Sequence, residues 1–480
     1  MGARQRNPIP IEYGLNKAVE EVGLSSSSAA LYECIVDNID GNVVVSRRPG
    51  LKSFADTGES ASIDGMLWWP SQEKMVVVCN GKVFTIDDSS GNLTTLTGTY
   101  FAAGERAILD DFGTAIYGAD TNNINKITTT TVTQLADGDA PTSVSHVAFI
   151  DQYLLANEIG TKKCHRSDVG TPDTWTSNWF SSEAKNDNLK AIGVENLYVY
   201  LLGDKTLEVW EDTGADDPFS RVSGGYIPSG TIAPYSFIYC YAPANTWVWL
   251  DQNKSLVALN GVATTIISPS MDRYLQQEDV VLTDAIGDYF RVLGHAFYAL
   301  HMPTQNETLV LDMTSGLWGH WGSWNSSTAS YDRWKGNCVC LAPTWGKVLV
   351  GDRSTGKVYS LDQETYQDAG NTIRMLIRTG HIDRGDIFAR KVCSRVDFRC
   401  KKTAPGGGST ITMVVKYRDN GETTWSNEKT VTLSAESGEL YYHGSLRRLG
   451  MYNTRQWEFY ITDNAPVAML PPIEDYEVFY

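Results

Sequence analysis

Short hydrophobic runs separated by turn residues recur through the middle of the chain. The recurring unit is a strand, a turn rich in Asp, Asn or Gly, and a second strand of the form Gly-Lys-apolar-x-x-apolar-Asp. Clear examples are GKVFTIDDSSG (81–91), KTLEVWEDTG (205–214), ETLVLDMTSGLW (307–318) and GKVYSLDQE (356–364). Such runs, bounded by residues that favour chain reversal, are typical of strands and hairpins. The pattern therefore predicts an all-β middle region.

The spacing of these units indicates one architecture. A period of about 40–50 residues with four short strands in each unit is typical of a β-propeller. One blade cannot bury both faces of its sheet alone, so neighbouring blades cover them and the ring closes. The sequence predicts a propeller of about seven blades over residues 61–370, with six or eight also open. The equivalent positions, at steps of 41, 40, 43, 49, 53 and 49 residues, are Val83, Ile124, Cys164, Leu207, Leu256, Leu309 and Val358.

The two ends of the chain do not follow the repeat. Residues 1–60 indicate an N-terminal extended arm that leads to Arg47 and Arg48. Residues 371–480 contain several alternating hydrophobic runs separated by loops, which predict a C-terminal β-sandwich-like domain. The expected strands of that domain are Arg390–Cys400, Thr410–Tyr417, Lys429–Leu433 and Gln456–Thr462.

Charge divides the chain in a similar way. The whole sequence has 40 Lys and Arg against 57 Asp and Glu, a net charge of −17. Residues 371–480 hold 15 basic and 13 acidic residues (+2), so residues 1–370 hold 25 and 44 (−19). This excess of acid argues against a protein that grips nucleic-acid phosphates over most of its surface, because such a grip needs Lys and Arg. The asymmetry favours electrostatic docking between parts or partners.

One predicted strand carries a basic stripe. Lys391, Arg395, Arg399 and Lys401 are two or four residues apart, so on a strand they share one face. A basic stripe on an acidic protein suits docking to an acidic neighbour. A solvated sheet face is the equally weighted alternative.

Three tryptophans lie close together in LWGHWGSWN (317–325). Trp318, Trp321 and Trp324 could form an aromatic platform for a sugar or a partner. The favoured interpretation is a blade strand whose rings pack between sheets, because Trp usually buries its large ring.

No motif predicts catalysis, a metal site or a cofactor. GDRSTGKV (351–358) resembles a phosphate-binding loop but ends in Val and leads into a strand, so it lacks the Mg²⁺-binding hydroxyl and the helix N-terminus. The His and Cys residues show no metal-ligand spacing. Paired glycosidase carboxylates cannot be selected from so many acidic residues. No run of about 18 apolar residues exists, so no membrane span is expected.

Three stretches together resemble the packaged-DNA stabilisation proteins, also called tail hub or nozzle proteins, of short-tailed bacteriophages. The first is the end of the arm, Arg48-Pro49-Gly50-Leu51, and the second is the blade pattern LVLDMTSGLW (309–318). The third is a C-terminal segment that contains RLG (448–450), RQWEFYIT (455–462) and PV (466–467). The similarity spans nearly the whole chain.

The resemblance implies a non-enzymatic virion protein of the phage tail, assembled in the host cytoplasm and serving head completion and DNA ejection. The implied assembly is a homo-oligomer, a hexameric ring below the portal-bound adaptor protein. That ring extends the DNA channel, helps to retain packaged DNA, and binds tailspikes or tail fibres and a tail needle or plug. No cofactor is implied.

Double-stranded DNA would pass through the ring without specific binding. Acidic walls repel phosphates within about a Debye length, ~8–10 Å at moderate salt, so we expect a lumen lined mainly by acidic and polar residues from 61–370. The alternative is a propeller glycosidase or depolymerase, or a sugar-binding lectin module, that acts on host surface polysaccharide. The candidate partner-contact residues are Arg47, Arg48, Lys391, Arg395, Arg399, Lys401, Trp318, Trp321 and Trp324.

Overall fold

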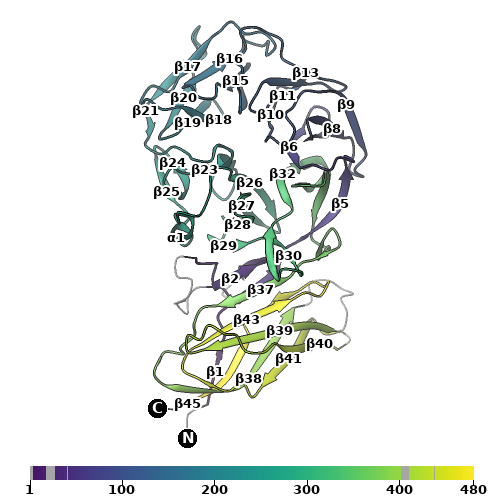
Figure 1. The fold of residues 1–480 in the computed structure, drawn as a ribbon, viewed down its shortest axis with the longest axis vertical. Coiled ribbons are helices and arrows are strands. Elements are labelled where there is room, and N and C mark those ends of the chain that lie inside the picture. Colours follow the sequence, from purple (N-terminus) through teal and green to yellow (C-terminus); the bar gives the residue numbers. More distant parts are fainter. Residues whose placement is uncertain (1–3, 18–27, 40–41, 402–409, 437, 480) are drawn as a thin grey trace.

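A computed structural model describes residues 4–17, 28–39, 42–401, 410–436 and 438–479 of the chain. Figure 1 shows a ring of small sheets joined to a layered β domain, with both termini at the end of that domain away from the ring. Strands dominate, and within the described ranges the one α-helix is the single turn α1 (Asp272–Leu275). None of the helices found there has the length and apolar character needed to cross a membrane.

Five sheets of four antiparallel strands follow one another around the ring (Figure 1). They are β6–β9 (Ile63–Trp69, Lys74–Cys79, Lys82–Ile86, Leu93–Thr99), β10–β13 (Ile108–Asp111, Ile116–Ala119, Ile124–Ile127, Val132–Gln134), β14–β17 (Val147–Ile150, Tyr153–Asn157, Lys163–Arg166, Trp179–Ser181), β18–β21 (Leu189–Glu195, Tyr198–Gly203, Leu207–Asp212, Phe219–Ile227) and β22–β25 (Ile238–Cys240, Thr246–Leu250, Leu256–Asn260, Ala263–Ile266).

Two further units complete the ring. Strands β26–β29 (Ile286–Val292, His295–Met302, Glu307–Asp312, Leu317–His320) form an antiparallel unit that is also bridged to the arm strand β2 (Ser28–Tyr32). The closing sheet combines β32–β34 (Gly336–Ala342, Lys347–Asp352, Lys357–Asp362) with β5 (Gly50–Asp56), which comes from the predicted arm and runs antiparallel to β34. Within the described residues, six sheets of the ring have no strand pairing with the C-terminal strands. The unit β26–β29 is the exception, because it belongs to the same hydrogen-bonded sheet as those strands.

The predicted propeller is confirmed. Every position that defines the predicted repeat lies in the third strand of a unit, from Val83 in β8 to Val358 in β34. The local pattern succeeds because the third strand follows a tight hairpin, and hairpin turns leave a clear signal of Asp, Asn and Gly.

The apolar cores of the ring lie between neighbouring units. Val76 of β7 packs in one cluster with Ile116 of β11, and Leu155 of β15 packs in another with Leu201 of β19. Burying one such side chain is worth about 1.5–3 kcal/mol. Each blade is therefore stabilised by the next, as stacking of incomplete units requires.

The C-terminal strands form two facing layers, and arm strands join both. The first layer runs β2, β37 (Met375–Thr379), β43 (Arg455–Ile461), β39 (Thr410–Asp419) and β40 (Lys429–Ser434). The second holds β41 (Tyr441–Arg447), β42 (Met451–Tyr452), β38 (Arg390–Lys401), β45 (Ile473–Phe479) and β1 (Arg4–Pro8), with β44 (Ala468–Met469) beside β38 and β4. The rings of Phe398 and Phe459 meet between the layers, 5.9 Å apart.

The remaining elements are short. Strands β3 (Cys34–Ile39) and β4 (Asn42–Arg47) form the arm hairpin, β30 (Gly322–Asn325) and β31 (Ser330–Arg333) form a hairpin beside β29, and β35 (Gln367–Asp368) and β36 (Asn371–Thr372) extend the closing sheet. Two 3-10 turns lie at Pro234–Ser236 and Pro343–Trp345.

The predicted domain boundaries at residues 60 and 370 stay predictions. The strands give a fuller description of the arm, which supplies β5 to the ring and β1–β4 to the C-terminal layers. One hydrophobic cluster contains Leu309 of the ring together with Ile377 and Phe459 of the C-terminal layers. The ring and the C-terminal layers therefore share a continuous core.

Candidate interaction surfaces

Arg48 lies fully buried where the arm enters the ring. Its Nη1 and Nη2 donate hydrogen bonds to the two carboxylate oxygens of Asp368, at 3.0 and 2.6 Å, and its Nε donates to Glu33. Its guanidinium also lies over the Trp321 ring, 5.4 Å from the centroid. Burial alone would lower the pKa of Arg48, but the two carboxylates outweigh burial and raise it. Arg48 thus ties the arm to the closing sheet.

Arg47 is buried as well and serves the C-terminal layers. It donates hydrogen bonds to the carbonyl oxygens of Asp463, of Ala465 at 3.3 Å and of Ile461 at 3.0 Å. Burial lowers the pKa of Arg47 to about 10. Both arginines were expected to contact a partner. Their side chains are instead enclosed by the chain itself and are not accessible in this structure. They are enclosed because β4 ends between the ring and the C-terminal layers.

Glycine is required two residues after Arg48. A Cβ atom on Gly50 would lie 2.4 Å from the carbonyl oxygen of Gln367 and 2.6 Å from that of Thr365. The Gly50 N–H donates to the Thr365 carbonyl at 2.8 Å. The Arg-Pro-Gly segment is therefore a close backbone crossing that starts β5.

The three predicted tryptophans do not form one exposed platform. Trp318 is 3% exposed and donates a hydrogen bond to the Ile267 carbonyl at 3.2 Å. Trp321 is 1% exposed and packs edge-on against Trp334. Trp324 is half-buried and stands on the β30–β31 hairpin. Packing between sheets thus describes two of the three rings, and a sugar-binding face made of all three is absent from the described surface.

The predicted basic stripe is broken by a β-bulge in β38. The register of β38 against β45 shifts between Cys393 and Arg395. Before the bulge the odd-numbered residues point inward, and after it the even-numbered residues do. Lys391 is therefore buried, and its Nζ donates to the carbonyl oxygens of Asp386 and of Asn453, the latter at 2.8 Å. Lys391 was expected on the basic face, and the inserted residue places it in the interior.

After the bulge the stripe continues on the surface. Arg395 is partly exposed, whereas Arg399 and Lys401 are exposed. The Arg399 guanidinium lies over the Tyr441 ring, 3.8 Å from its centroid. Arg447 pairs opposite Arg395 in the neighbouring strand β41 and is exposed too.

The first strand of the chain adds two arginines to this face. Arg4 pairs with Asp475 at 3.0 Å, and Arg6 pairs with Asp397 at 3.0 Å. Arg395 binds the same Asp397. Glu477 lies opposite Arg4 in the strand register and Glu12 also lines this face, so its positive excess comes from Arg399, Lys401 and Arg447. Exposed ion pairs of this kind contribute only about 0–1 kcal/mol to stability, so the excess matters more for recognition than for folding.

Arg6, Arg395, Arg399 and His443 line a groove of about 850 Å³, here called the basic groove. The groove lies on the face formed by β38, β41 and β1, with residues 470–473 at its edge. The sequence interpretation missed Arg4 and Arg6. The alternation Arg-Gln-Arg at positions 4–6 was the available signal, but nothing local shows that this strand pairs with β45.

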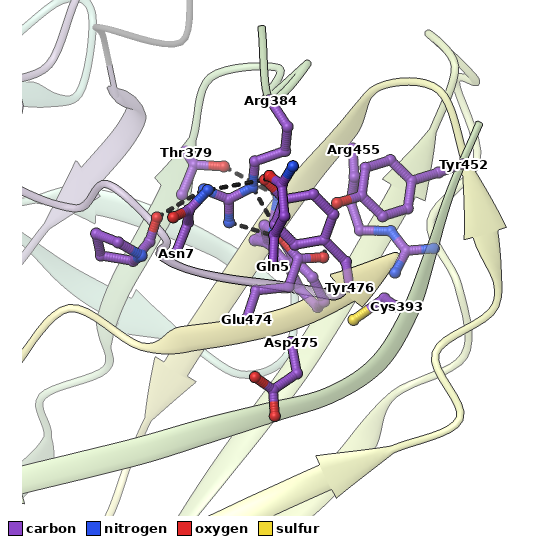
Figure 2. A network of polar contacts seen from close by, with 12 residues as sticks. Gln5, Asn7, Thr379, Arg384, Cys393, Tyr452, Arg455, Glu474, Asp475 and Tyr476 are labelled. Atoms are coloured by element: carbon purple, nitrogen blue, oxygen red, sulfur yellow. Dashed lines mark hydrogen bonds and ion pairs between the residues drawn. The ribbon is translucent and has the colours of Figure 1, made fainter. Parts of the chain in front are cut away.

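A polar network fixes β1 in place (Figure 2). Asn7 Nδ2 donates to the Tyr476 hydroxyl at 2.8 Å, and that hydroxyl donates to Gln5 Oε1 at 2.7 Å. Arg384 binds one oxygen of buried Glu474 through Nε and Nη2, at 3.1 and 2.6 Å. These bonds hold the start of the chain against its last strand, which positions the side chain of Arg6 at the groove.

The described residues contain no group of three or more His, Cys, Asp and Glu side chains placed to hold a metal ion. A second cleft, beside Trp324, includes Glu307 and Glu458 in its wall. Burial alone would raise the pKa of both carboxyls, but His320 and Lys17 lower that of Glu307 to about 2, and Arg378 and Lys416 lower that of Glu458. A glycosidase needs one carboxyl with a raised pKa as its general acid. These two groups therefore do not match that role.

Comparison with known proteins gives one informative match. The family model described as "Phage_stabilise: Bacteriophage P22 Gp10, beta-propeller" matches residues 9–366. No curated protein matches the chain.

Among solved structures, similar chains include the computationally designed Ika8 protein (12% identity, TM-score 0.36, 65% of this chain and 99% of that chain) and YCF48 bound to D1 peptide (9%, 0.41, 66% and 98%). BamB from Moraxella catarrhalis is also similar (10%, 0.39, 68% and 93%). These likenesses are too distant to bear on fold or function.

Proposed function

The chain belongs to the phage-stabilisation family described as the bacteriophage P22 Gp10 β-propeller, and on this premise we propose that it is the tail hub, or nozzle, protein of a short-tailed phage. The family is a structural phage family and not an enzyme class. The match over residues 9–366 carries the proposal, because it includes the arm strands β2–β5 and the complete ring.

In this role, copies of the chain form a homo-oligomeric ring, a hexamer, below the portal-bound adaptor protein. The ring extends the DNA channel and helps to retain the packaged DNA. The net charge of −19 on residues 1–370 supports a lumen that conducts DNA without holding it. Acidic walls repel phosphates within about a Debye length, ~8–10 Å at moderate salt.

The C-terminal layers supply contacts in this proposal. The basic groove, with Arg6, Arg395 and Arg399, would dock an acidic surface such as the propeller of a neighbouring copy. Charge complementarity of this kind speeds association and selects partners. The ring would also anchor tailspikes or tail fibres and a tail needle or plug.

Charge reversal tests the proposal. Arg395→Glu combined with Arg399→Glu places two negative charges in the basic groove, and we expect tail assembly to fail while the chain still folds. Lys52→Glu with Lys357→Glu is the matched control, because both lysines are exposed on the closing sheet and the change in charge is equal.

The measurement is negative-stain imaging of each purified chain, alone and with a portal–adaptor complex. Rings and tails should form with the control chain and be lost with the groove variant. Normal assembly by the groove variant would remove the docking role from the groove. A strict monomer that never joins the portal–adaptor complex would overturn the hub function itself.

A further inference from the structure

The cleft beside Trp324, described above, is separate from the basic groove and lies where the ring meets the C-terminal layers. This junction cleft has a volume of about 870 Å³ and is enclosed by the β30–β31 hairpin on one side and by β37, β39 and β43 on the other. Trp324, Arg374, Arg378, Lys416, Glu458 and Tyr460 are the lining residues that determine its chemistry.

Arg374 is the central cation of the junction cleft. Its side chain lies between two rings, with its guanidinium carbon 4.0 Å from the centroid of Trp324 and 4.0 Å from that of Tyr460. The residue is only 9% exposed. In the described part of the chain, no carboxylate oxygen lies within 4.0 Å of this guanidinium. A buried charge normally requires a counter-ion, and stacking on aromatic rings supplies only part of that stabilisation.

The carboxylates of the cleft already have partners. Glu458 is 1% exposed and is shared by Arg378 and Lys416, with Lys416 Nζ at 2.6 Å. Glu428 stands at the rim and accepts a hydrogen bond from the Tyr460 hydroxyl at 2.8 Å. Glu307, in the same wall, is paired with Lys17. With Lys17 counted, four cations meet three carboxylates, and Arg374 is the cation left without a counter-ion. This is a locally positive site in a chain whose net charge is −17.

A ring nitrogen of His320, in the same wall, also lacks a hydrogen-bond partner. His320 is 3% exposed, and its Nδ1 makes no hydrogen bond to any described residue. Its Nε2 faces Glu307 at 3.3 Å. The unpartnered Nδ1 is itself buried, so the group that the cleft offers to a bound molecule is the guanidinium fork of Arg374.

We propose that the junction cleft binds a side-chain carboxylate of an acidic peptide segment on a partner protein. The planar guanidinium of Arg374 matches the two oxygens of a carboxylate, a geometry that gives strong charge-assisted hydrogen bonds. A sugar would need a free ring face for stacking, and Arg374 covers the facing sides of Trp324 and Tyr460. The inference does not depend on the proposed ring assembly.

Binding of a fluorescently labelled glutamate decapeptide to the full chain tests the inference, with the glutamine decapeptide as the neutral probe. We expect the acidic peptide to bind and Arg374→Gln to weaken it at least about tenfold, since a hydrogen-bonded charge contributes about 1.5–3 kcal/mol. Arg291→Gln, an exposed arginine of β26, is the matched control and should change nothing.

Glu428→Gln provides a second readout that does not disturb the interior, because Glu428 is exposed. Removing this rim carboxylate should tighten peptide binding by about two- to fivefold, the range of a surface charge pair. Equal affinities for the normal chain, Arg374→Gln and Glu428→Gln would overturn the proposal. So would loss of binding in Arg399→Gln alone, which would assign the peptide to the basic groove, or binding of oligogalacturonate without binding of the acidic peptide.

Discussion

The seams inside the ring and the seam between the ring and the rest of the chain are built from different interactions. Neighbouring blades meet mainly through apolar clusters, such as the one that holds Leu155 and Leu201. Ion pairs such as Lys126–Asp173 and Arg106–Asp288 also join different blades of the ring. The arm and the C-terminal layers add buried charge to the seam that they make with the ring, where Arg48 lies between Glu33 and Asp368. A second charged contact there places His295 between Asp37 and Asp312.

This difference has a physical consequence. An apolar seam tolerates substitutions that keep volume, because dispersion and burial have no strict geometry. A buried ion pair is specific in register and fails when one partner is removed, since the other charge is left without solvation. Apolar contacts between blades should therefore tolerate substitution better than the buried charged contacts that orient the C-terminal layers relative to the ring.

The largest expected effect is at Arg48. Arg48→Ala leaves two buried carboxylates without a cation, which should lower the free energy of unfolding by about 3–5 kcal/mol. Urea unfolding of the full chain followed by circular dichroism measures this change. Combining Arg48→Met with Glu33→Gln and Asp368→Asn removes all three charges and should restore much of the loss. A triple variant no more stable than Arg48→Ala would contradict the account of this seam.

A smaller effect is expected inside the ring, at the seam between the β14–β17 and β18–β21 sheets. Leu155→Ala should cost about 2–5 kcal/mol because it opens a cavity between blades. Leu155→Met keeps the volume and should cost less than about 1.5 kcal/mol. Thermal unfolding of the three chains compares them. If the methionine variant were as unstable as the alanine variant, the tolerance inferred for apolar seams would be wrong.

The smallest expected effect is pH-dependent and lies at His295. Hydrogen bonds to Asp312 and then to Asp37 raise the pKa of His295 from 6.5 to about 10. The folded chain thus keeps a proton that the unfolded chain releases, so this stabilisation is complete below pH 6.5 and is lost as the pH rises through 10. His295→Gln should cost about 1.5–3 kcal/mol at pH 6 and progressively less towards pH 10.

Urea unfolding at pH 6, 8 and 10 measures the His295 effect. His443→Gln is the control, because His443 is an exposed histidine on β41. A cost that stays constant or grows with pH would show that the charged imidazolium does not hold the arm hairpin to β27 and β28.

Much of the ring was predictable from local sequence, and much of the candidate surface was not. Val83 and the positions equivalent to it mark the third strands because hairpin turns leave a local signal. Arg399 and Lys401 were placed correctly on an exposed strand face, because alternation along one strand is also local. Lys391, four residues from Arg395, was misplaced because one bulged residue reverses that alternation.

The sequence by itself determined that this chain is a propeller with an acidic body and a nearly neutral C-terminal part, since period, turn chemistry and net charge need no knowledge of distant contacts. Only the tertiary structure decided that Gly50–Asp56 closes the ring, that Arg4–Pro8 pairs with the last strand, and that Arg48 is buried. Those outcomes depend on pairing between strands hundreds of residues apart. Backbone hydrogen bonds are the same for any sequence, so the choice of partner follows from how the whole core packs.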